Sequence, residues 1–162
     1  MKNKFRCLCI IIIGGIIILF NFSGCFSKSD LIIPPKGMTP LETVQFYFEQ
    51  WNNKSRNGMN SVLSDEMKDT DSMSYLIYVK LTKSIEETEK HMKLEGVYFS
   101  ETFPGYIEYS IVEVDFEIEV KRSGFFTNID LPDGKSIIEN SRYVLGKINE
   151  DSNWIIISRG FA

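Results

Sequence analysis

Cysteine is scarce in this chain. Only Cys7, Cys9 and Cys25 occur among the 162 residues, and the first two lie within an apolar run near the N-terminus. If that run is removed from the mature protein, Cys25 is the only cysteine left. A single cysteine excludes an intramolecular disulfide and a thiol-based metal site, so the folded part must depend on its hydrophobic core.

Basic residues are also in deficit. Three of the 18 basic residues, Lys2, Lys4 and Arg6, precede the apolar run, and no acidic residue does. Without them, 15 basic residues face 22 acidic residues, a formal net charge of −7. A domain of this charge has no long-range attraction to nucleic acid or to anionic lipid, so neither is expected as a partner through charge.

Catalytic and metal-binding patterns are missing as well. The single histidine, His91, cannot form a triad or a metal cluster, and no serine lies in a Gly-x-Ser-x-Gly turn. Asp69-Thr70-Asp71 begins like a calcium loop, but Ser74 and Lys80 stand where the loop needs glycine and glutamate. We therefore predict no catalytic residue, no metal and no cofactor.

The N-terminus has the three parts of a secretory signal. Residues 1–6 are basic, residues 8–20 form an uncharged apolar stretch of 13 residues, and Phe22-Ser23-Gly24-Cys25 follows. The apolar stretch is short for a membrane span, which needs about 20 residues. The last four residues resemble a bacterial lipobox, which implies that Cys25 receives a diacylglycerol and becomes the first mature residue. An uncleaved anchor over 7–26 and an ordinary cleaved signal are the alternatives, and all three place the domain outside the cytoplasm.

The rest of the chain divides into a tether and one domain. Residues 25–38 contain Pro34-Pro35 and Gly37, which oppose regular structure and indicate a tether. Ile32 and Ile33 are apolar residues that would allow part of it to dock. Residues 39–162 have the length of a single domain, and the apolar content of 43% argues against disorder.

Two helices are expected first. Thr39-Pro40-Leu41-Glu42 combines an N-cap threonine, a first-turn proline and a capping-box glutamate, and the apolar spacing that follows predicts a helix over 40–54. A shorter helix over 59–67 would turn inward its apolar side chains, Met59, Val62, Leu63 and Met67.

Strands are expected after residue 75. A period-two pattern predicts a strand whose apolar face holds Ile77, Val79, Leu81 and Ile85. A longer strand covers 106–121, where a bulge near Ile111-Val112 would reconcile a change of parity. Strands over 136–149 and 154–159 follow, while 85–104 is ambiguous. Helices before antiparallel strands make an α+β domain with the helices on one face of the sheet.

The run from Thr39 to Lys54 resembles the opening helix of nuclear transport factor 2-like domains, in the form found in uncharacterised lipoproteins of low-GC Gram-positive bacteria. The alternating acids of the long strand, the turn before Asn153-Trp154-Ile155-Ile156 and the late Gly160 support this resemblance over residues 38–161. It implies a cone of helices on a curved antiparallel sheet with a cavity between them. Isomerases, dehydratases and non-catalytic domains share that cone, so the resemblance does not decide the activity.

The candidate site residues are few. Cys25 is the predicted lipidation site, and the polar groups that would line a cone cavity are Tyr47, Tyr109, Arg142 and Tyr143. Arg159 is a further arginine on a late strand that would reach a pocket or pair at the surface. An acidic row, Glu113, Asp115, Glu117 and Glu119, is either a cation or basic-partner surface or the solvated face of a strand.

Together, these features predict a lipid-anchored extracytoplasmic domain on the outer face of a bacterial membrane. We expect it to bind a small ligand, a peptide or an envelope protein without catalysis. The alternatives are a small isomerase-like or dehydratase-like enzyme or ligand carrier, favoured by an open cavity, and an interaction module that forms a homodimer through its sheet. A cone filled by Phe48, Trp51, Phe116 and Trp154 would oppose the enzyme.

Overall fold

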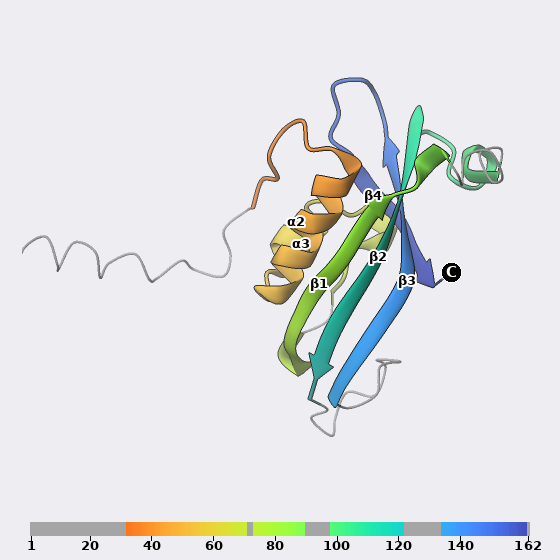
Figure 1. Ribbon diagram of the computed structural model, residues 1–162. Coiled ribbons are helices and arrows are strands. Elements are labelled where there is room, and N and C mark those ends of the chain that lie inside the picture. Colours follow the sequence, from red (N-terminus) through yellow and green to blue (C-terminus); the bar gives the residue numbers. More distant parts are fainter. Residues whose placement is uncertain (1–31, 71–72, 90–97, 122–133, 162) are drawn as a thin grey trace, which may run out of the picture. The chain divides into compact units, whose positions relative to one another are not determined.

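A computed structural model describes residues 32–70, 73–89, 98–121 and 134–161. These residues belong to one compact unit, Leu31–Ala162, in which the two helices that come first in the described chain lie against one face of a sheet (Figure 1). The predicted signal region, Cys25, His91 and residues 122–133 fall outside the described residues.

Helix α2, Pro40–Asn52, begins as predicted. The Thr39 side chain accepts a hydrogen bond from the Glu42 amide at 3.2 Å, and the Glu42 carboxylate accepts one from the Thr39 amide at 2.8 Å. This reciprocal pair satisfies two amides that a helix start would otherwise leave unbonded. The buried side of α2 carries Val44, Tyr47 and Phe48, which face the sheet.

The second helix is shorter than predicted. Helix α3 covers Arg56–Asn60, and separate 3₁₀ turns follow at Asp65–Met67 (η1) and Met73–Tyr75 (η2). The expected helix over 59–67 is wrong because the chain between α3 and η1 pairs with the last strand. The Ile156 amide donates to the Val62 carbonyl at 2.8 Å, and the Ser64 amide donates to the Ile156 carbonyl at 2.9 Å. Met59, Val62 and Leu63 are nevertheless buried, as the apolar pattern predicted.

Four antiparallel strands form the sheet in chain order: β1 (Leu76–Glu86), β2 (Glu108–Val120), β3 (Gly134–Lys147) and β4 (Ile155–Phe161). In the ambiguous stretch, β1 ends at Glu86 and residues 98–102 are helical. The α+β class, with a few helices packed on an antiparallel sheet, is therefore confirmed.

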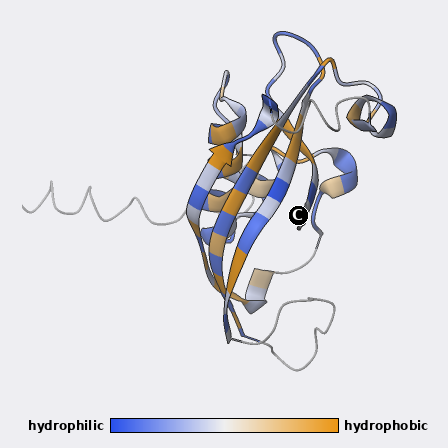
Figure 2. Ribbon diagram, turned by 45° about the vertical axis from the view of Figure 1, so that its right-hand side comes forward, coloured by the Kyte–Doolittle hydropathy of each residue, from blue (hydrophilic) through white to orange (hydrophobic). Residues whose placement is uncertain are grey.

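The sheet has a large core on one face and a small core on the other. On the inner face, α2 and α3 cover alternate residues of β2 such as Val112, Val114 and Phe116. On the outer face, a smaller cluster joins Phe99, Ile111, Val144 and Ile157 at one end of the strands. Figure 2 shows the alternation of hydrophobic and hydrophilic residues along the strands that this arrangement produces.

The predicted bulge at Ile111-Val112 is wrong. Ile111 pairs with Val144, and Val112 pairs with Tyr143, without a break in register. The parity of the apolar residues changes there because β2 is buried on both faces at this end, with Ile111 in the outer cluster and Val112 in the inner core.

The bulges lie instead opposite Asp115. Thr82 is an extra residue in β1 at this level, and Glu139 and Asn140 together face Asp115 from β3. The Thr82 hydroxyl donates to the Asp115 carbonyl at 2.9 Å, and the Asp115 carboxylate accepts from the Asn140 amide at 2.8 Å. Asn140 adopts a φ of 55°, a left-handed conformation that asparagine tolerates. Bulges on both sides of one residue bend the sheet here.

The predicted apolar face of β1 is wrong at two of its four residues, because of bulges. Val79 packs in the inner core and Leu81 packs against it, but Ile77 and Ile85 are 45% and 42% exposed. Ile77 is itself an extra residue in the register, and the extra Thr82 moves Ile85 to the outer face. The two-residue alternation of buried and exposed side chains does not hold along β1, because Ile77 and Thr82 have no partner in the pairing with β2.

Candidate functional site

Aromatic rings fill the contact between α2 and the middle of the sheet. The ring of Phe48 lies 5.0 Å from that of Phe116, 5.7 Å from Trp51 and 5.6 Å from Tyr143, measured between centroids. Tyr47 extends the cluster, 5.8 Å from both Trp51 and Tyr143. These separations are those of contacting rings. Three of the four residues whose packing would oppose an enzyme, Phe48, Trp51 and Phe116, contact one another, and Trp154 packs at the edge of the same core.

At β4, the edge of this aromatic cluster has a polar contact. Arg159, which is exposed, donates from Nη1 to the hydroxyl of the fully buried Tyr47 at 2.5 Å. Arg159 pairs across the sheet with Tyr143, so its side chain leaves the sheet on the same inner face. The guanidinium therefore lies between the hydroxyl of the buried Tyr47 and solvent.

Both tyrosines remain neutral at physiological pH. Burial raises the pKa of Tyr47 to about 12, and the positive charge of Arg159 opposes that rise. Burial also raises the pKa of Tyr143 well above its ordinary value. A tyrosine in this state can donate or accept a hydrogen bond, but it cannot act as a general base near neutral pH.

Asp69 contributes negative charge beside this contact, and its field further raises the pKa of Tyr47. Its backbone is held by Asn60 at the end of α3, whose side chain accepts from the Asp69 amide at 3.0 Å and donates to the Asp69 carbonyl at 2.9 Å. Arg56 binds the Thr70 carbonyl at 2.6 Å. Helix α3 thus positions an acidic residue near Arg159.

The structure brings together only two of the four polar groups expected to line a cavity. Tyr47 and Tyr143 are adjacent in the inner core. Tyr109 packs on the outer cluster, where its hydroxyl donates to the Phe103 carbonyl at 2.8 Å. Arg142 also lies on the outer face, with Nη2 4.0 Å from the Glu113 carboxylate. Neighbouring residues of a strand point to opposite faces, which separates Arg142 from Tyr143.

The acidic row lies on the same outer face as Arg142. Lys135 lies 2.8 Å from Glu117, and Lys83 lies 3.8 Å from Asp115. The acids are therefore interleaved with cations from both neighbouring strands. Within the described ranges, no group of histidine, cysteine or carboxylate side chains is arranged to hold a metal ion.

From the sequence, Arg159 is a candidate pocket residue with no assigned partner. Asp69 stands out only in a stretch that does not match a calcium-binding loop. An extra residue, Ile157, interrupts the β3–β4 register, so the face of Arg159 does not follow from counting along β4. Asp69 lies on the irregular segment that follows η1, and such a segment has no periodic signal. The proximity of these two residues to Tyr47 had no signal in the sequence.

Comparison with protein-family models, curated proteins and solved structures gives no significant match to the chain. Among the helices that the structure describes, none is long and apolar enough to cross a membrane.

Proposed function

We propose that this protein is a lipid-anchored extracytoplasmic domain that binds a small ligand, a peptide or a protein partner at the bacterial cell envelope. The observation that carries the proposal is the basic N-terminus, the uncharged 13-residue stretch and Phe22-Ser23-Gly24-Cys25 in sequence. The diacylglycerol thioether would form at Cys25, and palmitate is one fatty acid it would carry.

We also propose that the domain is a nuclear transport factor 2-like cone. The capped opening helix, the order of helices before strands and the bend of the sheet at Asp115 support this. The aromatic contacts between Phe48, Phe116 and Tyr143 favour binding at a surface over catalysis in an interior cavity.

Mass spectrometry of the mature N-terminus tests the lipid anchor. We expect the chain purified from bacterial membranes to begin at Cys25 and to carry a diacylglycerol adduct. A Cys25→Ala variant should leave the membrane fraction or accumulate unprocessed. A membrane-bound chain that retains Met1 and has no adduct would support the uncleaved anchor instead.

A ligand carrier is a second candidate, favoured by the contact between Arg159 and Tyr47. The guanidinium has five N–H donors and is partly open to solvent, so it offers a site for a small polar or anionic molecule. Thermal-shift screening of carboxylates and phosphates against the natural chain and Arg159→Gln tests this candidate. Stabilisation of the natural chain alone would support it, and equal shifts in both would reject it.

A further inference from the structure

The start of the folded unit is hydrogen-bonded to the turn between β3 and β4. The Gly37 amide donates to the Asn153 side chain at 3.2 Å, across 116 positions of the sequence. Met38 packs against the inner core, and Thr39 caps α2. Figure 1 shows the segment before α2 beside the turn that leads into β4. The chain therefore enters the unit at one defined end, which we call the entry end.

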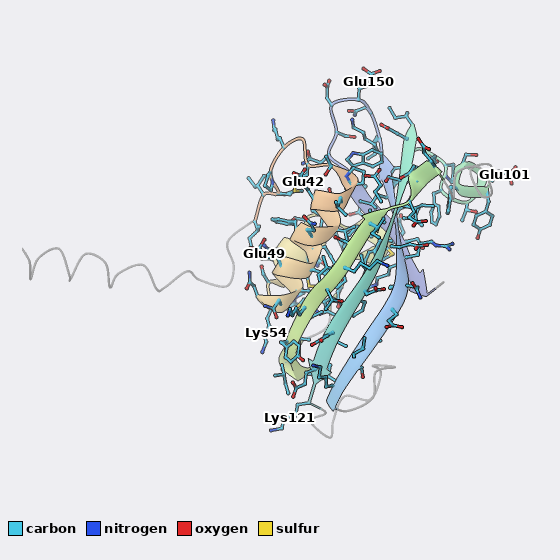
Figure 3. All side chains as sticks on the ribbon, viewed as in Figure 1. Glu42, Glu49, Lys54, Glu101, Lys121 and Glu150 are labelled. Carbon is cyan, nitrogen blue, oxygen red and sulfur yellow. The ribbon has the colours of Figure 1, made fainter. Side chains whose placement is uncertain are left out.

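The opposite end of the unit lies one full strand length away. It holds Leu76 at the start of β1, Lys121 after β2 and Gly134 at the start of β3. Figure 3 shows Glu150 and Lys121 at opposite ends. Strand β3 has 14 residues, which corresponds to about 43 Å at the usual rise per residue. We call this second end the far end.

We infer that the entry end faces the bilayer and that the far end points away from it. This inference rests on the proposed lipidation of Cys25, which is 12 positions before Gly37. A flexible chain of that length has a root-mean-square span of about 19 Å, and even when fully extended it reaches only about 41 Å. Because β3 spans at most about 43 Å and is shortened by the bend at Asp115, an inverted domain would need a tether stretched to roughly twice its root-mean-square span.

In the described part of the tether, residues 32–37, most side chains are exposed. Ile33 is 74% exposed, and Pro35, Lys36 and Gly37 are exposed too. Of the two isoleucines that would allow part of the tether to dock, Ile32 is half-buried and loses more of its surface than Ile33, which remains largely exposed. The first firm contacts are those of Gly37 and Met38, so these residues define the attachment point.

Charge does not produce this orientation. The entry end carries the exposed Glu150 and Asp151 in its turn, which are repelled by anionic headgroups. Attachment at Gly37 keeps the entry end near the membrane, and these carboxylates favour a gap between turn and lipid. The far end and the acidic row remain accessible to an envelope partner.

Energy transfer to the bilayer tests the orientation. The full chain is expressed in a lipidating bacterium as Glu150→Cys or Lys121→Cys, labelled with a donor fluorophore and reconstituted in vesicles of phosphatidylcholine with a minor share of phosphatidylglycerol. The vesicles contain an acceptor on a headgroup. Because Cys7 and Cys9 are removed and Cys25 is acylated, each variant has one reactive thiol. Mass spectrometry of each sample establishes the adduct independently of the fluorescence.

We expect transfer from position 150 to be about twofold or more above transfer from position 121, because their mean heights differ by roughly a strand length. A flexible glycine-serine insertion of about 24 residues after Lys36 should reduce this difference, since the span of the tether grows with the square root of its length. Equal or greater transfer from position 121 in adducted protein would overturn the orientation alone. Absence of the adduct would overturn both the orientation and the lipid anchor.

Discussion

Arg142 and Tyr143 are neighbours on β3, yet their environments differ completely. Tyr143 is buried among the rings that join α2 to the sheet. Arg142 lies on the outer face beside Glu113, in a row of charges from three strands. Helices bury the middle of the inner face, whereas on the described outer face the buried apolar residues are those of the cluster around Ile111 and Val144. Stability should therefore depend on the inner face, and the outer face should tolerate change except in that cluster.

Removal of the Phe48 ring should produce the largest loss. Phe48 is 3% exposed and contacts the rings of Tyr47, Trp51, Phe116 and Tyr143. Phe48→Ala should lower the free energy of unfolding by about 3–5 kcal/mol, because it leaves a cavity among them. Urea denaturation of the two proteins measures this change.

The outer face supplies the control for Phe48→Ala. Ile137 is 63% exposed, so Ile137→Ala should change the free energy of unfolding by less than about 0.5 kcal/mol. Similar losses in the two variants would contradict the difference between the faces.

The second largest effect should be a loss of folding stability at high pH, through the ionisation of Tyr47 on the inner face. The pKa of Tyr47 is raised by burial to about 12 from an ordinary value of 10.0. The unfolded chain releases this proton first, so the stability that the buried neutral phenol contributes is fully present below pH 10 and is lost as pH rises to 12. The loss is on the order of 2–3 kcal/mol.

A comparison with Tyr47→Phe isolates this effect. The stability advantage of the natural chain over the variant should shrink between pH 10 and pH 12, measured by urea denaturation at each pH. Tyr98→Phe is the matched control, because Tyr98 is 59% exposed and has no comparable burial to lose. A constant advantage across this pH range would show that Tyr47 ionises as readily in the folded chain as in the unfolded one.

A glycine substitution should reveal the small core of the outer face. A Cβ atom on Gly146 would lie 2.5 Å from the ring of Tyr106, which packs against the outer cluster. Gly146→Ala should therefore lower the free energy of unfolding by about 1–3 kcal/mol.

Two controls test whether the clash with Tyr106 is the cause: Gly160→Ala, and the double variant Gly146→Ala with Tyr106→Ala. A Cβ atom on Gly160 meets nothing within 4 Å, so Gly160→Ala should change stability by less than about 0.5 kcal/mol. Tyr106→Ala should remove much of the penalty of Gly146→Ala, because it removes the clashing ring. Full additivity of these two changes would exclude the clash as the cause.

Loss of the cap on α2 should have the smallest effect. Thr39→Ala removes the oxygen that accepts from the Glu42 amide, which should cost about 1 kcal/mol. Thr39→Ser keeps that oxygen and should retain most of the stability. If both variants lose the same amount, the methyl group of Thr39 is more important than its hydroxyl.

Local patterns predicted much of this fold. The capping box located the start of α2, the alternating residues located β2, and the order of elements indicated the α+β class. The patterns did not reveal residues that depend on pairing. Ile77, Thr82 and Ile157 are extra residues in the strand register, and the pairing of Val62 and Ser64 with Ile156 replaced a predicted helix. Tyr47 and Tyr143 meet because they lie on buried faces, whereas the contact of Arg159 with Tyr47 depends on a bulge that no local pattern shows.

The two bulges opposite Asp115 have a consequence for insertions and deletions in the gene. Loss of the Thr82 codon would still leave Leu81 on the inner face and Lys83 on the outer face, since the extra residue lies between them. Loss of the Asn140 codon would likewise leave Ile138 and Ser141 paired with Phe116 and Val114. Such deletions would keep the chemistry of both faces and remove the bend between them. The curvature of this sheet can therefore change by single codons without any change in what each face presents.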